Sequence, residues 1–120
     1  MPWEVDWELV EGWLLSLDDK SYLEVRAALG VLAEHGPHLG RPLVDTVSRS
    51  RHKNMKELRP GSSGRSKIRI LFAFDPARRA ILLVAGDKGQ SWRRWYEIHV
   101  PIADDRFDAH LAHLGKERRA

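Results

Sequence analysis

The pattern of apolar and polar positions predicts several short β-strands. Residues 3–9 alternate between apolar and acidic side chains, which is typical of a half-buried strand. Further strands are expected at 53–59, 66–74 and 80–86, and the last of these is apolar on both faces, as at the centre of a sheet. In the strand 66–74, one predicted face carries Ile68, Ile70, Phe72 and Phe74, and the other carries Arg69, Leu71 and Ala73.

Apolar residues at helical spacing predict a helix over Lys20–Glu34. Asp18-Asp19 can cap its first turn, and Gly36-Pro37 ends it. A shorter helical segment is expected just before it, at Trp13–Leu17. The chain therefore begins with a strand followed by two helices.

The last part of the chain predicts a further helix after Pro101, capped by Asp104 or Asp105. Between the helices and the strands, residues 37–52 are polar with two prolines, which indicates a loop with a short extended piece around 43–47. The apolar stripe of the last helix consists of Phe107, Leu111 and Leu114.

The order of elements, β-α-α-β-β-β-α, predicts one α+β domain over residues 1–120. We expect a compact fold with a small, mostly antiparallel sheet, two N-terminal helices and a C-terminal helix. Gly61–Gly64 and Asp75-Pro76 supply the two hairpin connections. The helices are expected on one side of the sheet, so that Arg69 and the other basic strand residues stand on the open side.

Composition narrows the class of protein. Hydrophobic residues make up 42% and charged residues 31% of the 120 residues, as in ordinary globular proteins. The absence of cysteine excludes disulfides and cysteine-based zinc sites. No apolar run is long enough to span a bilayer, and the acidic N-terminus is unlike a secretory signal. We therefore expect a cytoplasmic protein without a membrane partner.

Charge is distributed unevenly along the sequence. Residues 1–19 hold six acidic and no basic side chains, whereas residues 49–69 hold eight basic side chains against Glu57 alone, a local charge of +7. Such a block can be a solvated face or an anion-binding surface. Because cations within strands suit a polyanion, RNA is the plainest ligand.

Four of these cations are expected to converge. Lys56 and Arg59 lie on the first strand of the meander, Arg69 lies within the second, and Lys88 follows the third. Adjacent strands are about 4.8 Å apart, so such side chains can meet. They could bind RNA alone, or they could promote its cleavage, because the 2′-hydroxyl of RNA supplies the nucleophile and the protein need only align it and move protons. Lys53, Arg65 and Lys67 would extend the RNA-binding surface.

Aromatic and basic residues are interleaved at 92–99. Arg93, Arg94 and Trp95 could grip phosphates and stack on bases, and Tyr96 or His99 could transfer protons. Trp92 and Trp95 could instead pack under the last helix.

A metal site is not expected. His110 and His113 have the spacing of a ligand pair, but neither a third ligand nor a cysteine accompanies them. No cofactor is expected either.

Several segments in this order resemble the RelE/ParE superfamily of type II toxins, and more closely its HigB or phage Gp49-like branch. The resemblance covers nearly the whole chain and is strongest over 54–111. The segments are Met55-Lys56-Glu57-Leu58-Arg59, Ile68–Asp75, Ala80–Ala85, Gly86-Asp87-Lys88, Trp92–Tyr96 and Pro101–Phe107.

The resemblance implies a RelE-like fold and metal-independent cleavage of mRNA on the ribosome, which inhibits translation. Arg69 matches the arginine that contacts the scissile phosphate, Lys88 the basic residue after the next strand, and Tyr96 the aromatic acid-base position. Lys56 and Arg59 match the basic strand that leads into the hairpin. The implied partners are the ribosome, mRNA and a cognate antitoxin, often a helix-turn-helix protein, through which the toxin would oligomerise.

Two features depart from the family pattern, and two other functions stay open. Lys53 and Lys56 are three residues apart instead of alternating, and the segment 89–99 is longer and richer in tryptophan than in the simplest members. The same fold also serves ParE-like inhibitors of DNA gyrase and could serve an inactive homologue that only binds its antitoxin. The cluster of Arg69, Lys88 and Tyr96 favours the nuclease.

Overall fold

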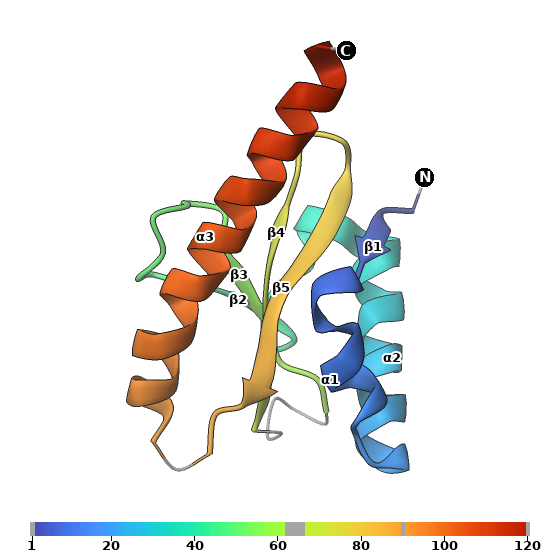
Figure 1. Ribbon diagram of the computed structural model, residues 1–120. Helices are drawn as coiled ribbons and strands as arrows, with labels where there is room; N and C mark the ends of the chain where they lie inside the picture. Colours follow the sequence, from blue (N-terminus) through green and yellow to red (C-terminus); the bar gives the residue numbers. More distant parts are fainter. Residues whose placement is uncertain (1, 62–66, 90, 120) are drawn as a thin grey trace.

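The computed structural model describes residues 2–61, 67–89 and 91–119 (Figure 1). The strands and the two N-terminal helices expected from the sequence are present, but the strands expected at 3–9 and 53–59 are shorter, at Glu4–Asp6 and Lys56–Leu58. The expected extended piece around 43–47 is strand β2. The elements are β1 (Glu4–Asp6), η1 (Glu8–Val10), α1 (Glu11–Leu15), α2 (Asp19–His35), η2 (Gly36–His38), β2 (Val44–Thr46), β3 (Lys56–Leu58), β4 (Ile68–Phe74), β5 (Arg79–Asp87) and α3 (Trp92–Arg119).

The strands form one five-stranded sheet in the order β1-β5-β4-β3-β2. β1 pairs with β5 in parallel, and the other neighbours are antiparallel. The expectation of an α+β fold with a mostly antiparallel sheet is confirmed, and the architecture is consistent with the RelE-like fold. Most of the expected Gly61–Gly64 turn lies outside the described residues.

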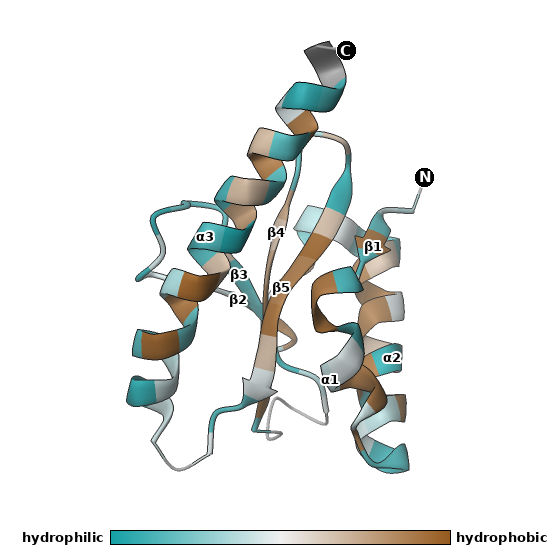
Figure 2. Ribbon diagram, in the orientation of Figure 1, coloured by the Kyte–Doolittle hydropathy of each residue, from teal (hydrophilic) through white to brown (hydrophobic). Residues whose placement is uncertain are grey.

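The two faces of the sheet are covered by different helices, so the expectation of helices on one side only is wrong. In Figure 1, α1 and α2 lie on one side of the sheet and α3 on the other. The reason lies in β4, which is apolar on both faces: Ile70 and Phe72 pack in the core under α2, and Leu71 and Ala73 pack under α3. Figure 2 shows the apolar strands between these two helical layers.

A β-bulge shifts the register between β4 and β5. Leu71 pairs with Val84, but the next residue, Phe72, pairs with Leu82. The extra residue, Leu83, therefore turns toward α3 together with Val84, and both are buried there. The carbonyl of Leu83 accepts a hydrogen bond from the Arg106 guanidinium on α3 at 2.6 Å.

Helix α3 begins at Trp92, nine residues before Pro101 in the sequence, so the expectation that the helix follows Pro101 is wrong. A buried stripe of Val100, Ala103 and Phe107 runs past the proline, which itself lies on the exposed side. Packing on the sheet thus maintains the helix through a residue that usually ends one. Asp104 is not a cap, because it lies inside the helix and is buried.

The start of α2 follows the sequence closely. Asp18 is its N-cap, and its carboxylate accepts a hydrogen bond from the Ser21 backbone N–H at 3.4 Å. Among the described residues, no helix combines the length and the apolar character needed to cross a bilayer.

Candidate functional site

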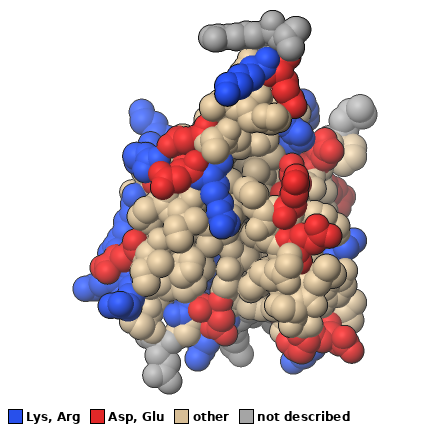
Figure 3. All heavy atoms as spheres, in the orientation of Figure 1, with Lys and Arg blue, Asp and Glu red and all other residues tan. Residues whose placement is uncertain are grey.

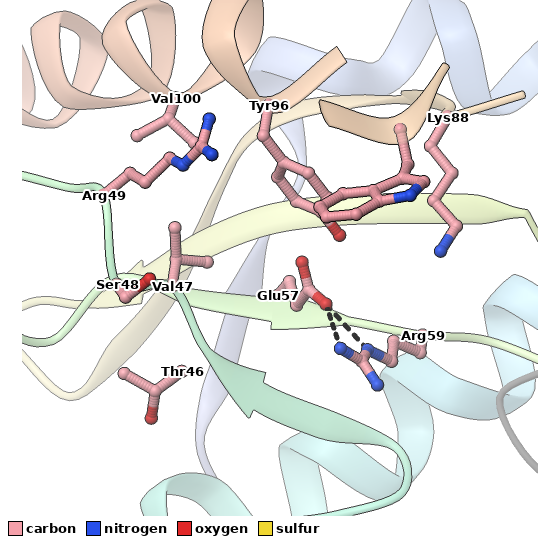
Figure 4. Close-up of a pocket in the computed structure, with 10 residues that line it drawn as sticks. Thr46, Val47, Ser48, Arg49, Glu57, Arg59, Lys88, Tyr96 and Val100 are labelled. Atoms are coloured by element: carbon pink, nitrogen blue, oxygen red, sulfur yellow. Dashed lines mark hydrogen bonds and ion pairs between the residues drawn. The ribbon is translucent and has the colours of Figure 1, made fainter. Parts of the chain in front are cut away.

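A cavity of about 360 Å³ opens between α3 and the strands β2 and β3 (Figure 4). Its walls combine cations, aromatic rings and one carboxylate. β5 brings Lys88 to one end of it, because the Lys88 backbone N–H donates to the Lys67 carbonyl at 2.9 Å and so extends the pairing with β4. The lining residues are Thr46, Val47, Ser48, Arg49, Glu57, Arg59, Lys88, Trp92, Tyr96 and Val100.

The carboxylate of Glu57 is the centre of this cavity. Glu57 is only 3% exposed, yet it lines the cavity and is surrounded by cations. Both Nε and one terminal nitrogen of Arg59 lie 2.7 Å from its Oε1, and Nε of Arg69 lies 4.0 Å from the same atom. Burial without such partners would be costly for a carboxylate, so the cations stabilise it in its charged form.

Tyr96 approaches the same carboxylate from α3. In Figure 4 its hydroxyl points toward Glu57. Burial, followed by the neighbouring Glu57 carboxylate, raises the pKa of Tyr96 to about 12, and Arg69 opposes the shift. Tyr96 is therefore a neutral hydroxyl at physiological pH, able to donate a proton but not to accept one as a tyrosinate.

Lys88 completes the cationic end of the cavity. Its pKa is lowered, first by burial and then by the positive charge of Arg69, with a smaller contribution from Arg59; Glu57 opposes the shift. The sequence placed Arg59, Arg69 and Lys88 together, and the structure brings them around one carboxylate.

The sequence predicts Arg69 on an open face of the sheet, but the structure buries it. It is 3% exposed, because α3 covers this side of the sheet. Its guanidinium donates to the Ile68 carbonyl at 2.8 Å and lies beside Glu57. Arg69 thus acts on the cavity through Glu57, while Arg59 and Lys88 line it directly.

Lys56 does not join the cluster. It pairs with Phe72 across the sheet, and paired residues share a face, so its side chain leaves the sheet on the side opposite Glu57. There its Nζ donates to the Thr46 hydroxyl at 3.1 Å. The prediction that Lys56 converges with the other cations was wrong, because neighbouring residues of a strand point to opposite faces of the sheet.

Trp95 is a core residue, which contradicts its expected role in base stacking. It is 8% exposed, stacks on His99 with ring centroids 4.4 Å apart, and covers Gly86 so closely that a Cβ there would lie 3.1 Å from its Nε1. Tyr96, the next residue, is thereby fixed over the cavity. Arg93 and Arg94 are exposed on the first turn of α3, outside the lining.

The remaining predicted contacts lie away from the cavity lining. Lys53 and Lys67 are exposed, and Arg65 lies outside the described residues. Figure 3 shows acidic side chains gathered on the side of α1 and α2, and basic ones along the opposite edge.

The two histidines considered as a metal pair have other partners. His110 bonds the buried Asp75 at 2.7 Å, and His113 pairs with Glu117 at 3.1 Å. Within the described part of the chain, no group of three acidic, histidine or cysteine side chains is placed to hold a metal ion.

Glu57 lines the cavity but is absent from the site residues predicted from the sequence. A signal existed, because Glu57 is the one acidic residue among the eight basic residues of 49–69. A lone carboxylate at the centre of a basic block indicates a position where opposite charge is needed.

Comparison with known proteins assigns the chain to a family. Residues 12–108 match the family described as "Phage derived protein Gp49-like". The chain belongs to the Gp49-like family. Two relatives from Mycobacterium tuberculosis support this assignment: "Putative toxin HigB2" is 59% identical over 110 residues, and "Putative toxin HigB3" is 52% identical over 103 residues.

The coverage of these relatives differs. The match includes 92% of this Gp49-like chain but 55% of the first relative, so the chain spans about half the length of that protein. For the second relative, the match includes 86% of the chain and 88% of the relative.

Proposed function

We propose that this Gp49-like chain is the toxin of a type II toxin–antitoxin system and cleaves mRNA on the ribosome. The observation that carries the proposal is the Glu57–Tyr96 pair in a cavity whose other polar walls include Arg59 and Lys88. A proton acceptor, a proton donor and cations are the three groups that cleavage by the 2′-hydroxyl of RNA requires. The toxin names of the two relatives agree with this function.

The reaction can be written with these groups alone. The 2′-oxygen forms a bond to the adjacent phosphorus, and the bond from phosphorus to the 5′-oxygen of the next nucleotide breaks. Glu57 takes the proton of the 2′-hydroxyl, and Tyr96 donates its proton to the leaving 5′-oxygen. Glu57 then returns a proton to Tyr96, whose hydroxyl points toward it, which restores both groups.

The cations have a different role from the proton-transfer pair. Arg59 and Lys88 line the cavity and would offset the negative charge that builds up on the phosphorane. Burial is the first cause of the lowered pKa of Lys88 and the positive charge of Arg69 the second, and a bound phosphate would favour the charged lysine against both. Arg69 would orient Glu57 from the side away from the substrate.

Cleavage of a defined message on purified, programmed ribosomes tests the proposal. We expect breaks within the translated codons, with a 2′,3′-cyclic or 3′-phosphate on one product and a 5′-hydroxyl on the other. Cleavage should persist in excess EDTA once ribosome integrity is controlled for, because the side chains supply every proposed step. Products with a 5′-phosphate would refute attack by the 2′-hydroxyl.

Induction in cells separates this function from the alternatives. An mRNA endonuclease produces breaks within reading frames, whereas a gyrase inhibitor produces DNA double-strand breaks and an SOS response. An inactive homologue produces neither.

The proposed partner is a cognate antitoxin of the helix-turn-helix type. Its acidic segment would cover the cavity bearing Arg59 and Lys88, or it would dock on the helices and block entry to the ribosome. Either arrangement should suppress cleavage, and covering the cavity would also make association fall with rising salt. Mixing the toxin with the product of its neighbouring gene tests this, and a stable complex with undiminished cleavage would refute it.

A further inference from the structure

The cavity has a second basic end that the catalytic proposal does not use. In Figure 4, Arg59 and Lys88 lie at one end and Arg49 at the other, with Glu57 and Tyr96 between them. Arg49 comes from the loop between β2 and β3, and it lines the cavity together with Ser48 and the apolar side chains of Val47 and Val100. The cavity is therefore longer than one phosphate site.

The backbone that carries Arg49 is fixed to α3. Asp104, which is 2% exposed, accepts hydrogen bonds from the Ser50 hydroxyl and from the Arg51 backbone N–H, the latter at 3.1 Å. Two residues further on, the His52 ring bonds Asp108 at 2.7 Å. Residues directly after Arg49 are thus anchored on the helix that also carries Tyr96, so the position of Arg49 relative to Tyr96 is set before any ligand binds.

The side chain of Arg49 itself is held only loosely. Its guanidinium lies 3.7 Å from the Glu97 carboxylate, and the two side chains are 47% and 57% exposed. A pair this exposed contributes little, so Arg49 can exchange Glu97 for a better ligand. A phosphodiester is such a ligand, because a guanidinium can donate two parallel hydrogen bonds to its oxygens.

We propose that Arg49 binds the phosphate next to the scissile one, so that a single strand of RNA runs along the cavity from Lys88 to Arg49. The intervening nucleoside would lie against Val47 and Val100. Glu97 occupies Arg49 in the free protein and is displaced when RNA enters. This inference rests on the proposed function, since it assigns a second contact for the same substrate.

A double-mutant cycle, which combines protein variants with chemically modified messages, tests the contact between Arg49 and the flanking phosphate. Messages on programmed ribosomes carry one neutral methylphosphonate on either side of the scissile phosphate, and cleavage rates are measured at limiting toxin. With the unmodified protein, neutralising one of the two positions should slow cleavage about tenfold, as for loss of a hydrogen bond to a charged group. Arg49→Ala should be slowed equally on the ordinary message and no further by that methylphosphonate.

Two variants complete the design. Glu97→Gln should accelerate cleavage at limiting toxin, because it frees Arg49, and this gain should vanish in Arg49→Ala/Glu97→Gln. Lys20→Ala removes one exposed positive charge from α2, on the other face of the sheet, and should leave the rate and the methylphosphonate effect unchanged.

The outcomes distinguish a failure of the Arg49 contact from a failure of the proposed nuclease function. Wild-type cleavage rates for Arg49→Ala, or an undiminished methylphosphonate effect in that variant, would overturn the Arg49 contact while the nuclease function stands. An Arg49→Ala defect without coupling to either flanking phosphate would place the contact elsewhere on the ribosome and overturn it too. An uncleaved message with the unmodified protein would overturn the nuclease proposal and this inference together.

Discussion

The hydroxyl of Tyr96 on α3 points toward the carboxylate of Glu57 on β3, and this approach brings the helix and the strand together across the cavity. The two residues change each other's chemistry. Burial and the charge of the carboxylate keep the phenol protonated, and guanidinium groups surround the carboxylate. In the proposed reaction the pair transfers protons, and in the fold it lies between two layers.

Removal of the Tyr96 hydroxyl should separate these two roles. In Tyr96→Phe we expect cleavage on programmed ribosomes to fall by about 100- to 10,000-fold, the range for loss of a general acid. The ring stays in place and Glu57 keeps Arg59 as a partner, so the cost in unfolding free energy should be about 1 kcal/mol. Single-turnover cleavage and urea unfolding measure the two effects. A variant that cleaves at the wild-type rate would remove Tyr96 from the reaction.

The raised pKa of Tyr96 gives a test that requires no substrate. The chain has two tyrosines, so Tyr22→Phe leaves Tyr96 as the single phenol. In the folded variant, tyrosinate absorbance should appear at a pH of about 12, and in denaturant at about 10.

The sign of the linked stability follows from this shift. Because the folded pKa lies above the unfolded one, the contribution of Tyr96 is complete below pH about 10 and is lost as the pH rises toward 12. Wild type should therefore lose its advantage over Tyr96→Phe in that window. Parallel stability curves for the two proteins would contradict the assignment.

Arg69 should matter for the stability of the fold as well as for activity. Arg69→Met leaves the buried Glu57 with less compensating charge, and we expect a loss of about 3–5 kcal/mol in unfolding free energy. Arg93→Met, an exposed change on α3, is the matched control and should cost little. If the two variants unfold at the same urea concentration, Arg69 does not compensate Glu57.

The contact between Gly86 and Trp95 should also be sensitive. A Cβ at position 86 would lie 3.1 Å from the indole nitrogen, so Gly86→Ala requires the Trp95 ring to shift by a few tenths of an ångström. Because Trp95 packs in the core beside Tyr96, we expect this shift to destabilise the protein by about 1 kcal/mol and to slow cleavage. Gly30→Ala in α2 meets nothing within 4 Å and should stabilise the protein by up to about 1 kcal/mol. Thermal unfolding of both variants provides the comparison.

The sequence was informative where local pattern determines structure. The alternation of Ile70 and Phe72 with Leu71 and Ala73 correctly predicted which residues of β4 share a face. Asp18 predicted the start of α2. It was misleading at Pro101, because the burial of Val100 and Ala103 against the sheet overrides a local helix breaker.

The candidate site was predictable only in part. The cations Arg59 and Lys88 could be found from charge and strand order. Lys56 was assigned to the wrong face, because register depends on pairing partners that a single sequence does not contain. Glu57 and Arg49 required the tertiary structure, since their roles depend on α3 lying over the sheet.

The cavity is completed by α3, the helix that follows its other walls in the sequence. Glu57, Arg59 and Lys88 precede α3, whereas Tyr96 and the Asp104 anchor belong to it. A nascent chain that has emerged only as far as β5 therefore carries the cations without the proton donor. If the protein cleaves translated mRNA, the chain cannot cleave the message that encodes it until α3 has been made and has packed onto the sheet.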